Sequence, residues 1–411
     1  MTVMPHEEVS FRAWIADKLF LGMTFSEYLK KLITPFNIVA ALILAVGLPV
    51  TFVRFTQGLG AVTNLSHNTP WGLWIGVDIL GGIALAAGSF ILASAVYLFR
   101  LKDYYAIIRP AILTGFLGYL LEIVAVLFDL GRPWRLPYPI FVSHGVTSVM
   151  FLVGWVVFLY FACQFVQFSP AIFEWLGWKN LRRRVARLTI AATVFAAILF
   201  TVHQSALGAL YLLAPGKLHP LWYTPLLPVL FLVSAVIAGI SMVTFESMLS
   251  HRIFSSQISH RDHENFDNIT IGLGKAAAPA LFTYFCLVWI GVAHGHHWAL
   301  LNTPLGHWFL IEVLGFVLVP CLIFVWAVRR QSVTLVRFAA IYTVIGILLN
   351  RINVSVVAFN WQLADRYFPK WTEFVVTLTV TTVGVLAFRW IVNRMPVLRR
   401  HPDYLPEYER G

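Results

Sequence analysis

Five ionisable residues stand inside long apolar stretches of the sequence, where a charge is costly and therefore points to chemistry. Histidine titrates near neutral pH, and a buried carboxyl group can keep a proton that an exposed one would lose. Such groups suit proton exchange with a quinone, whose two carbonyl oxygens take up protons when the ring is reduced. The same residues could instead pair only with one another or with a nearby arginine. The five are Asp78, Glu122, His203, Glu246 and Glu312.

The elements that carry these residues are membrane spans. The chain of 411 residues is 59% hydrophobic and 12% charged, whereas soluble proteins have about 45–50% apolar and about 25% charged residues. This composition excludes a soluble enzyme, a disordered chain, a disulfide scaffold and a coiled coil. Long apolar runs predict an all-α integral membrane protein with about ten transmembrane helices in bundles. The predicted spans are 36–56, 71–99, 109–128, 140–166, 188–213, 225–250, 270–291, 308–328, 334–350 and 371–392.

The basic residues predict the orientation of these spans. Of the 30 Lys and Arg residues, 23 fall on the side of the termini, 6 on the opposite side, and Arg54 inside the first span. Basic loops stay in the cytoplasm, so both termini are predicted to be cytoplasmic, and the net charge of +11 does not indicate nucleic-acid binding. We expect a cytoplasmic interfacial amphipathic segment (1–35), a ten-helix transmembrane domain (36–393) and a cytoplasmic tail (394–411). The six residues on the opposite side are Arg132, Arg135, Lys217, Arg351, Arg366 and Lys370.

Four of the five ionisable residues are predicted to lie in the outer half of the membrane. At a rise of about 1.5 Å per residue, Asp78 and Glu122 lie about 10 Å and His203 about 15 Å below the outer surface. Glu246 lies toward the cytoplasm, where it could begin a proton path or turn to the interface as an anchor. We place Glu246 and Glu312 on a predicted proton path.

The sequence offers few ligands for a metal or a haem. Cys163, Cys286 and Cys321 occur singly, without the spacing of an iron–sulfur or c-type haem site. A haem between membrane helices usually needs two histidines, and His203 is the only deep one. The outer cluster at 294–297 could bind a metal, but a solvated loop is the better interpretation. We expect no haem, no iron–sulfur cluster and no metal in this chain.

Two outer segments resemble each other. Residues 68–78 and 302–312 both read N-T-P-x-G-x-W-x-x-x-[DE], and each places a carboxylate one turn beyond a tryptophan. We predict that the two segments cap equivalent helices of two related bundles, although chance or convergence would give the same pattern.

The longer polar motifs are PWGLWIGVD at 70–78, FDLGRPWR at 128–135, HQSALG at 203–208, PGKLHPLW at 215–222, VAFN at 357–360 and YFPKW at 367–371. Together they resemble the NrfD/PsrC family of quinone-interacting membrane subunits, and within it the HybB-like and QrcD-like branch. The resemblance covers nearly the whole chain, from about residue 36 to residue 395.

The resemblance implies a cofactor-free membrane subunit that binds menaquinone near the periplasmic face, beneath a ferredoxin-like iron–sulfur subunit. It assigns Asp78, Asp129, Arg132 and His203 to the quinone site, and Glu122 joins them by depth alone. His203 and Asp78 are the predicted catalytic residues. The full set of predicted quinone-binding residues is Asp78, Glu122, Asp129, Arg132, His203, Gln204 and Trp71.

We therefore expect a multi-pass protein of the bacterial cytoplasmic membrane that anchors a periplasm-facing respiratory oxidoreductase and passes electrons between an iron–sulfur partner and menaquinone. It would be catalytic only within the complex, whose further members would be a catalytic subunit, a multihaem cytochrome c or a nickel–iron hydrogenase. Both the menaquinone-reductase type and the hydrogenase type fit, and proton translocation is left open. The alternatives are a secondary transporter that uses the same buried charges, or a purely structural anchor.

Overall fold

The structure is a computed structural model that describes residues 11–143, 145–258, 260–364 and 366–398. Over these residues the chain is helical and forms no named strand, which confirms the predicted all-α fold. The first ten residues and the predicted tail from residue 399 onward lie outside the described residues.

Ten helical segments of the described chain are long and apolar enough to cross a membrane, as predicted. Three of them combine α-helical with π-helical pieces. The ten are α3 (Pro35–Gln57), η1–α5–α6–η2 (Trp74–Gly81, Gly82–Ala86, Gly88–Ala93, Ser94–Leu98), α7 (Tyr105–Asp129), α9 (Val149–Leu176), α10 (Lys179–Leu212), α11 (Leu227–Ile253), α12 (His260–His294), α13–η7–α14 (Pro304–Leu310, Ile311–Leu318, Val319–Arg329), α15–η8 (Val333–Ile352, Asn353–Val357) and α16 (Trp371–Arg394).

The fourth span differs from its predicted bounds at both ends. It was predicted over 140–166, but α9 begins at Val149 and continues to Leu176. Residues 130–148 instead form a loop with two short helices, η4 (Pro133–Arg135) and α8 (Tyr138–Phe141). The polar residues near the predicted end, Gln164 and Gln167, are buried in the bundle and do not interrupt the helix.

Arg351 is inside the ninth span and not in an outer loop, so its predicted place was wrong. The predicted span ended at 350 because an arginine usually marks the membrane surface. In the structure the helix continues through η8, and the Arg351 side chain is only 1% exposed. Neighbouring helices supply its hydrogen-bond acceptors, because Arg351 Nη2 donates to Ser234 Oγ at 2.8 Å. An arginine satisfied in this way does not end a span.

The described part of the predicted N-terminal segment forms two short helices, α1 (Phe11–Phe20) and α2 (Phe25–Leu32). The break falls at Leu21 and Gly22, both with positive φ. Thr24 then starts α2 with a capping box, because its hydroxyl accepts from the Glu27 amide while the Glu27 carboxylate accepts from Thr24. The cytoplasmic, interfacial location of this segment stays a prediction.

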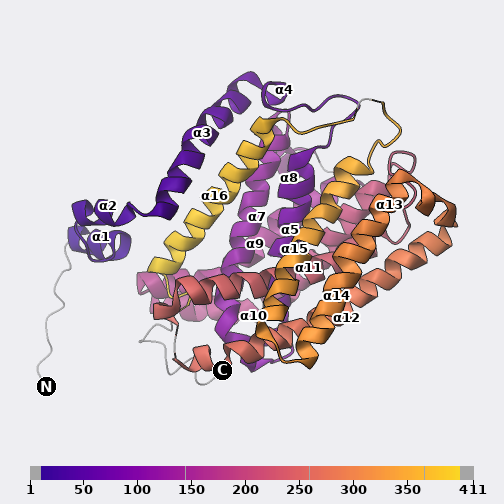
Figure 1. Ribbon diagram of the computed structural model, residues 1–411. Coiled ribbons are helices and arrows are strands. Elements are labelled where there is room, and N and C mark those ends of the chain that lie inside the picture. Colours follow the sequence, from indigo (N-terminus) through magenta and orange to yellow (C-terminus); the bar gives the residue numbers. More distant parts are fainter. Residues whose placement is uncertain (1–10, 144, 259, 365, 399–411) are drawn as a thin grey trace, which may run out of the picture.

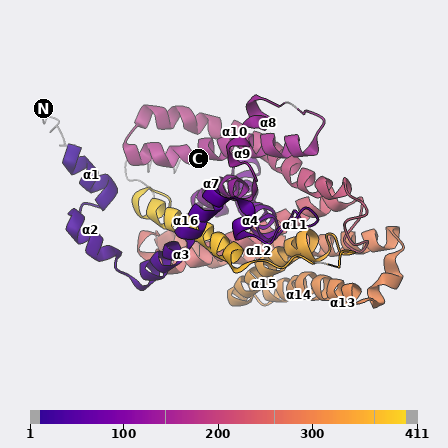
Figure 2. The ribbon, with the colours of Figure 1, turned by 90° about the horizontal axis from the view of Figure 1, so that it is seen from above.

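The spans form two bundles of four and one outer pair (Figures 1 and 2). The first bundle consists of η1–η2, α7, α9 and α10, and the second of α11, α12, α13–α14 and α15. The two outer helices, α3 and α16, pack on each other, and α16 also packs on α7. Viewed from above, α9 and α10 lie on one side of α11, and α13–α15 lie on the other (Figure 2).

The two bundles meet along the most buried spans. In the most apolar window of each span, 72% of Trp74–Leu98 and 67% of Leu227–Ile253 is buried, against 17% of Pro35–Gln57. The two buried spans cross where Gly88 of α6 meets Gly239 of α11, and a Cβ on Gly88 would lie 2.9 Å from the Gly239 carbonyl oxygen. Small residues therefore let the two backbones touch, as is common between membrane helices.

Loops gather at two ends of the molecule, the outer end and the inner end. The outer end is formed by residues 58–73, 130–143, 145–148, 213–226, 295–303, 358–364 and 366–370. The inner end is formed by α1, α2 and residues 99–104, 177–178, 254–258, 330–332 and 395–398. The names follow the predicted orientation, which itself stays a prediction.

Candidate functional site

The centre of the first bundle contains a buried carboxyl–imidazole pair. Glu122 of α7 and His203 of α10 lie with Oε1 and Nε2 3.8 Å apart, and their side chains are 2% and 0% exposed. On the other side of the ring, His203 Nδ1 is 3.3 Å from the Tyr119 hydroxyl. Tyr119 and Glu122 are three residues apart on α7, so both reach the same imidazole. The sequence predicted Glu122 and His203 in one site, and the structure brings them together.

Polar atoms without partners collect beside this pair. Glu122 Oε2, His203 Nε2 and both amide atoms of Gln204 are buried and have no hydrogen-bond partner among the described residues. Gln204 lies beside the Tyr119 hydroxyl, but without hydrogen-bond geometry for either amide atom. Buried polar groups in folded proteins nearly always have partners, so such a gathering indicates a place for water or a polar ligand.

A line of polar side chains continues from Tyr119 toward the inner end. The Tyr119 ring lies against Tyr160 of α9, with ring centroids 4.2 Å apart. Gln164 Nε2 then donates to the Tyr160 hydroxyl at 2.7 Å and to Ser89 Oγ at 2.9 Å. One helical turn further, Gln167 Nε2 donates to Thr193 Oγ1 at 3.3 Å.

This line follows one face of α9. Tyr160, Gln164, Gln167 and Glu174 are all buried and stand at helical spacing, over a rise of about 21 Å. None of these residues was predicted in the site, because Tyr160, Gln164 and Gln167 carry no charge and Glu174 lies beyond the predicted span 140–166. The spacing i, i+4, i+7 of polar residues in an apolar span was the signal that could have found them.

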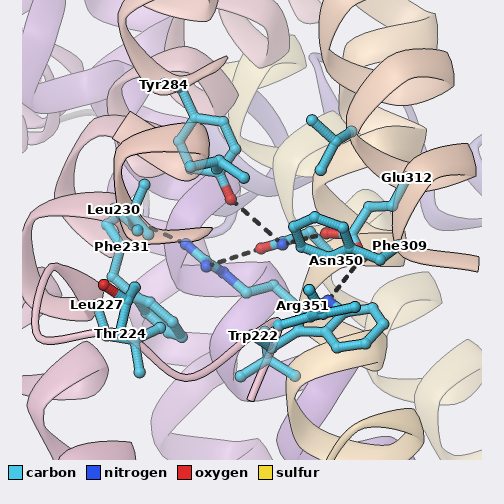
Figure 3. A pocket seen from close by; sticks show the side chains of 15 residues that line it. Trp222, Thr224, Leu227, Leu230, Phe231, Tyr284, Phe309, Glu312, Asn350 and Arg351 are labelled. Atoms are coloured by element: carbon cyan, nitrogen blue, oxygen red, sulfur yellow. Dashed lines mark hydrogen bonds between the residues drawn. The ribbon is translucent and has the colours of Figure 1, made fainter. Parts of the chain in front are cut away.

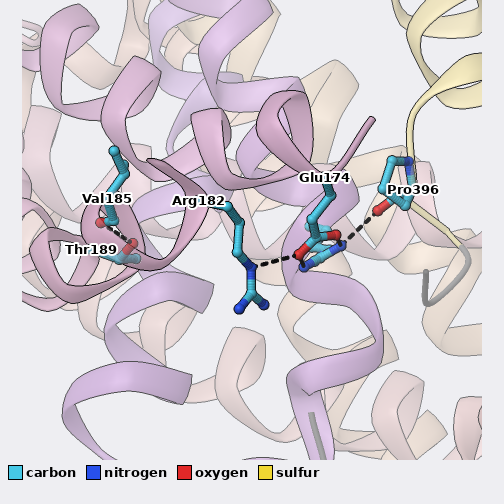
Figure 4. Close-up of polar contacts among 6 residues, drawn as sticks. Glu174, Arg182, Val185, Thr189 and Pro396 are labelled. Carbon is cyan, nitrogen blue, oxygen red and sulfur yellow. Dashed lines mark hydrogen bonds and ion pairs between the residues drawn. The ribbon is translucent and has the colours of Figure 1, made fainter. Parts of the chain in front are cut away.

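The line ends in an ion cluster at the inner end (Figure 4). The buried Glu174 carboxylate accepts from both terminal nitrogens of Arg109, each at 2.9 Å, and from Arg182 Nε at 3.1 Å. Arg109 also donates to the Pro396 carbonyl oxygen at 2.8 Å. The cluster ties α7, α9 and α10 to the segment after α16.

A second group of predicted residues lies nearer the outer end, between η1, α7 and α16. Asp78 Oδ2 accepts from Thr377 Oγ1 at 2.7 Å. Asp129, at the last residue of α7, is within electrostatic reach of Asp78, and its Oδ1 has no hydrogen-bond partner among the described residues. Arg54 of α3 holds the end of α7 through the carbonyl oxygens of Phe128 and Leu130, each at 2.6 Å. Asp78 and Asp129 therefore belong to one group between η1, α7 and α16, and Arg54 connects the end of α7 to the outer helix α3.

Arg132 and Trp71 lie outside both groups. Arg132 is exposed in the loop before η4, so the structure does not bring its guanidinium to the buried carboxyl groups. Trp71 stacks on Phe359, with centroids 4.8 Å apart, and meets Tyr211 edge-on at 5.2 Å. It packs at the outer end, between the loop that precedes η1 and the loop that follows η8.

Glu312 belongs to a separate network in the second bundle (Figure 3). Its carboxylate accepts from Trp222 Nε1 at 2.9 Å, Asn350 Nδ2 at 2.6 Å and Asn353 Nδ2 at 2.5 Å. The Asn350 carbonyl oxygen in turn accepts from Arg351 Nη1 at 3.2 Å. Asn350 thus links the carboxylate to the guanidinium, and all three partners of Glu312 are donors.

A small cavity adjoins this network. It has a volume of about 30 Å³ and is lined in part by Glu312, Tyr284 and Arg351. Arg351 lies over the Phe231 ring, 3.9 Å from its centroid, and its Nε has no hydrogen-bond partner among the described residues. A volume of this size holds about one or two water molecules, which is too little for a quinone ring.

Glu246, the other residue of the predicted proton path, lies on α11 in the inner half of the molecule. It is beside Thr114 of α7, yet Glu246 Oε1 and Thr114 Oγ1 both lack hydrogen-bond partners within the described chain. The structure therefore separates Glu246 from Glu312, and both from the Glu122–His203 pair.

The two similar outer segments share local structure. Asp78 lies in the π-helical η1 and Glu312 in the π-helical η7. The preceding tryptophans each donate an indole N–H to a neighbouring helix: Trp74 to the Glu373 carbonyl at 3.1 Å, and Trp308 to Asn353 Oδ1 at 3.0 Å. Both π-helices pack against α15, one from each bundle. Their origin by duplication stays a prediction.

The comparisons with known proteins give a consistent family. The chain matches the family described as "Polysulphide reductase, NrfD" over residues 61–360. A protein of Nitratidesulfovibrio vulgaris is 48% identical over 377 residues, which cover 91% of this chain and 97% of that protein. The probable Ni/Fe-hydrogenase 2 b-type cytochrome subunit of Escherichia coli is 31% identical over 349 residues, 84% of this chain and 88% of that subunit. The menaquinone reductase integral membrane subunit of N. vulgaris is 25% identical over 391 residues, 87% of this chain and 90% of that subunit.

The name of the E. coli relative includes a b-type cytochrome, but the surroundings of His203 do not fit a haem ligand. Its Nδ1 lies 3.3 Å from the Tyr119 hydroxyl and its Nε2 3.8 Å from Glu122 Oε1, so both ring nitrogens already face protein side chains. That this chain carries no haem stays a prediction. The family match and two relatives above 30% identity, by contrast, confirm the resemblance noted from the motifs. The chain belongs to the polysulphide reductase NrfD family, multi-pass membrane proteins whose relatives named above include membrane subunits of oxidoreductases.

Proposed function

We propose that this chain is the menaquinone-reactive membrane subunit of a multi-subunit oxidoreductase, and that the quinone head group is bound at Glu122, His203 and Gln204. The observation that carries this proposal is the set of buried polar atoms without partners at these three residues. The name of the menaquinone reductase subunit among the relatives supports the choice of substrate.

The chemistry of these groups matches the two carbonyl oxygens of a quinone. A neutral imidazole donates from Nε2 when Nδ1 accepts from the Tyr119 hydroxyl, and the Gln204 amide donates from Nε2. Reduction adds two electrons and two protons to the quinone. The electrons would come from the iron–sulfur partner. The Glu122 carboxyl group and the His203 imidazole, with Oε1 and Nε2 3.8 Å apart, are positioned to supply the two protons, and His203 would take up a proton at Nδ1 from the Tyr119 side as it gives one up at Nε2.

Asp78 and Asp129 would line the approach from the lipid. Asp78 is partly exposed, and the neighbouring α3 is the least buried span. A head group entering between α3 and η1 would pass these carboxyl groups before it reached Glu122. Arg132, exposed at the outer end, would lie on the face that meets the partner subunit.

Protons would reach the site along the polar face of α9. Tyr119, Tyr160 and Gln164 are in contact, and Gln167 and Glu174 continue the same face to the inner end. Side-chain amides do not carry protons alone, so water molecules between these residues would complete the path. If protons are taken up at the inner end and consumed by a quinone nearer the outer end, charge crosses part of the membrane and turnover is electrogenic. Glu246 remains the alternative entry.

The partner would be an iron–sulfur subunit that docks at the outer end. The loop from 130 to 148 exposes large apolar side chains there, among them Trp134 at 71% and Phe141 at 72% exposure. Exposed aromatic and apolar groups of this kind are typical of protein contacts or of the membrane interface. With the predicted orientation, this end faces the periplasm of a bacterial cell.

The test uses the purified complex with its own electron donor and a short-chain menaquinone analogue. His203→Gln and Glu122→Gln should each weaken binding of the analogue about 5- to 150-fold, because each leaves a buried group unpaired, and should slow its reduction. Thr201→Ala on the exposed face of α10 is the matched control and should change neither. Wild-type binding in both glutamine variants would refute the site, and failure of the wild-type complex to bind the analogue would refute the function.

A further inference from the structure

A polar cavity lies at the inner end, on the opposite side of the first bundle from the proposed quinone site. It has a volume of about 350 Å³, within the range of about 300–1,000 Å³ that is usual for small-molecule sites. It opens between α1 and the last turns of α9 and α16. The lining residues are Asp17, Lys18, Leu21, Trp175, Asn393, Arg394 and Pro396.

The cations of this cavity are held in different ways. Arg394 is 5% exposed and is fixed by its contacts, because Nε and Nη2 donate to the Leu19 carbonyl oxygen at 3.1 and 2.6 Å. Nη2 also donates to the Tyr28 hydroxyl, and Nη1 to the Trp390 carbonyl oxygen. A guanidinium has five N–H groups, and the described residues supply no acceptor for the second N–H of Nη1. Arg394 thus keeps one donor for a ligand.

Lys18 has an exposed partner. Its ammonium lies 3.4 Å from Asp17, whose side chain is 70% exposed, and Lys18 itself is 27% exposed. An exposed ion pair of this kind contributes little to stability, so the Lys18 ammonium can exchange Asp17 for a ligand. With Arg394, Lys18 and Asp17, the cavity carries one positive charge in excess, so its chemistry favours a singly charged anion.

The level of the cavity in the membrane indicates where such an anion comes from. Trp175 lies one residue before the end of the span Val149–Leu176, and Asn393 and Arg394 are the last two residues of the span Trp371–Arg394. The ends of spans lie at the headgroup layer, where tryptophan is common. The neighbouring helix α2 exposes Phe25 and Leu29, as expected of a helix that rests on lipid.

We propose that this cavity binds the phosphate of an anionic phospholipid, with Lys18 and the free N–H of Arg394 as its ligands and the Trp175 ring against the glycerol. A lipid bound there would join α1 to the ends of α9 and α16. The site is independent of the proposed quinone chemistry.

The experiment is native mass spectrometry of the full chain in detergent, titrated with phosphatidylglycerol or with phosphatidylcholine as the neutral comparison. We expect one phosphatidylglycerol to bind in preference to phosphatidylcholine. Lys18→Gln should weaken that binding about fivefold, the effect of one basic residue near a charged headgroup, and Lys18→Arg should retain it. Lys102→Gln, an exposed lysine of the same end, is the control and should match the wild type.

Two outcomes would overturn the proposal. The first is equal binding of phosphatidylglycerol and phosphatidylcholine, or an equal loss of phosphatidylglycerol binding in Lys18→Gln and Lys102→Gln. The second is displacement of phosphatidylglycerol by millimolar glycerol 3-phosphate, which would identify a site for a soluble phosphate ester and not for a lipid. Because Lys18 is partly exposed and its ion pair is with the exposed Asp17, we expect its substitution to leave the fold intact, so that the comparison stays interpretable.

Discussion

The partners of Glu312 give a sharp prediction about its charge. Trp222, Asn350 and Asn353 all present N–H groups to the carboxylate, and an indole N–H cannot accept a proton in return. A protonated carboxyl group would turn its own hydrogen toward one of these donors. We therefore predict that Glu312 is ionised and acts as the anion that balances Arg351 through Asn350. It does not suit the role of a proton carrier.

The variant Glu312→Gln keeps the shape and removes the charge. Its new amide nitrogen must face one of the three donors, and the buried Arg351 loses its counter-ion. Breaking one side of a buried ion pair costs about 3–5 kcal/mol. A cost of about 1 kcal/mol shifts Tm by about 2–4 °C in domains of 150–250 residues and by less in longer chains, so we expect a drop on the order of 5–10 °C.

The assay is thermal unfolding in detergent, followed by a double-mutant cycle with Arg351→Met. Because the two residues act through Asn350, the loss in the double variant should be smaller than the sum of the single losses by about 1–3 kcal/mol. Asp267→Asn, a carboxylate that is 72% exposed, is the control and should change stability by about 0.5 kcal/mol or less. A wild-type Tm in Glu312→Gln, or strictly additive losses, would refute the ionised pair.

Three further predictions concern the packing and the outer loops. Gly88→Ala should lower stability by about 1–3 kcal/mol because its Cβ would press on the Gly239 backbone, while Gly154→Ala, with open space at its Cβ, should be neutral in the same unfolding assay. Burial, and then the charge of a neighbouring histidine, lower the pKa of His219 to about 4. The unfolded chain binds that proton near pH 6.5, so stability should fall as the pH drops from about 6.5 to about 4, and His219→Gln should flatten this part of the curve of Tm against pH. Arg54→Met should cost about 1–3 kcal/mol for each of the two carbonyls that it leaves unpaired, and limited proteolysis after residue 57 should become faster; unchanged cleavage would show that α3 is held by packing alone.

The sequence predicted the spans well where apolar runs and loops alternate. A lipid-exposed segment must be helical to satisfy its backbone hydrogen bonds, so a long apolar run indicates a membrane helix. The prediction failed where a polar residue is satisfied inside the protein. Arg351 was predicted in an outer loop, yet Ser234 of another helix accepts a hydrogen bond from its guanidinium inside the protein. Such partners come from distant parts of the chain, and a single sequence does not reveal them.

The candidate site was predicted in part. Depth along the spans placed Glu122 and His203 at similar levels, and these two residues do meet. Depth does not give the direction in which a side chain points around its helix. Asp78 therefore faces Thr377 of α16, and Glu312 faces the second bundle. Depth could also not find Tyr119, whose hydroxyl is not charged and which nevertheless contacts the imidazole.

The π-helical stretches have a consequence for how relatives of this chain are compared. Each π-helical turn holds about one residue more than an α-helical turn, so a regular helix in its place would be one residue shorter while the residues on both sides kept their faces. Asp78 and Glu312 both lie within such stretches. A homologue with a regular helix at 74–81 or 311–318 would need a one-residue gap in any alignment. Without that gap, an alignment would pair each carboxylate with the residue next to its true counterpart. An acidic residue present in both proteins would then appear to be missing from one of them.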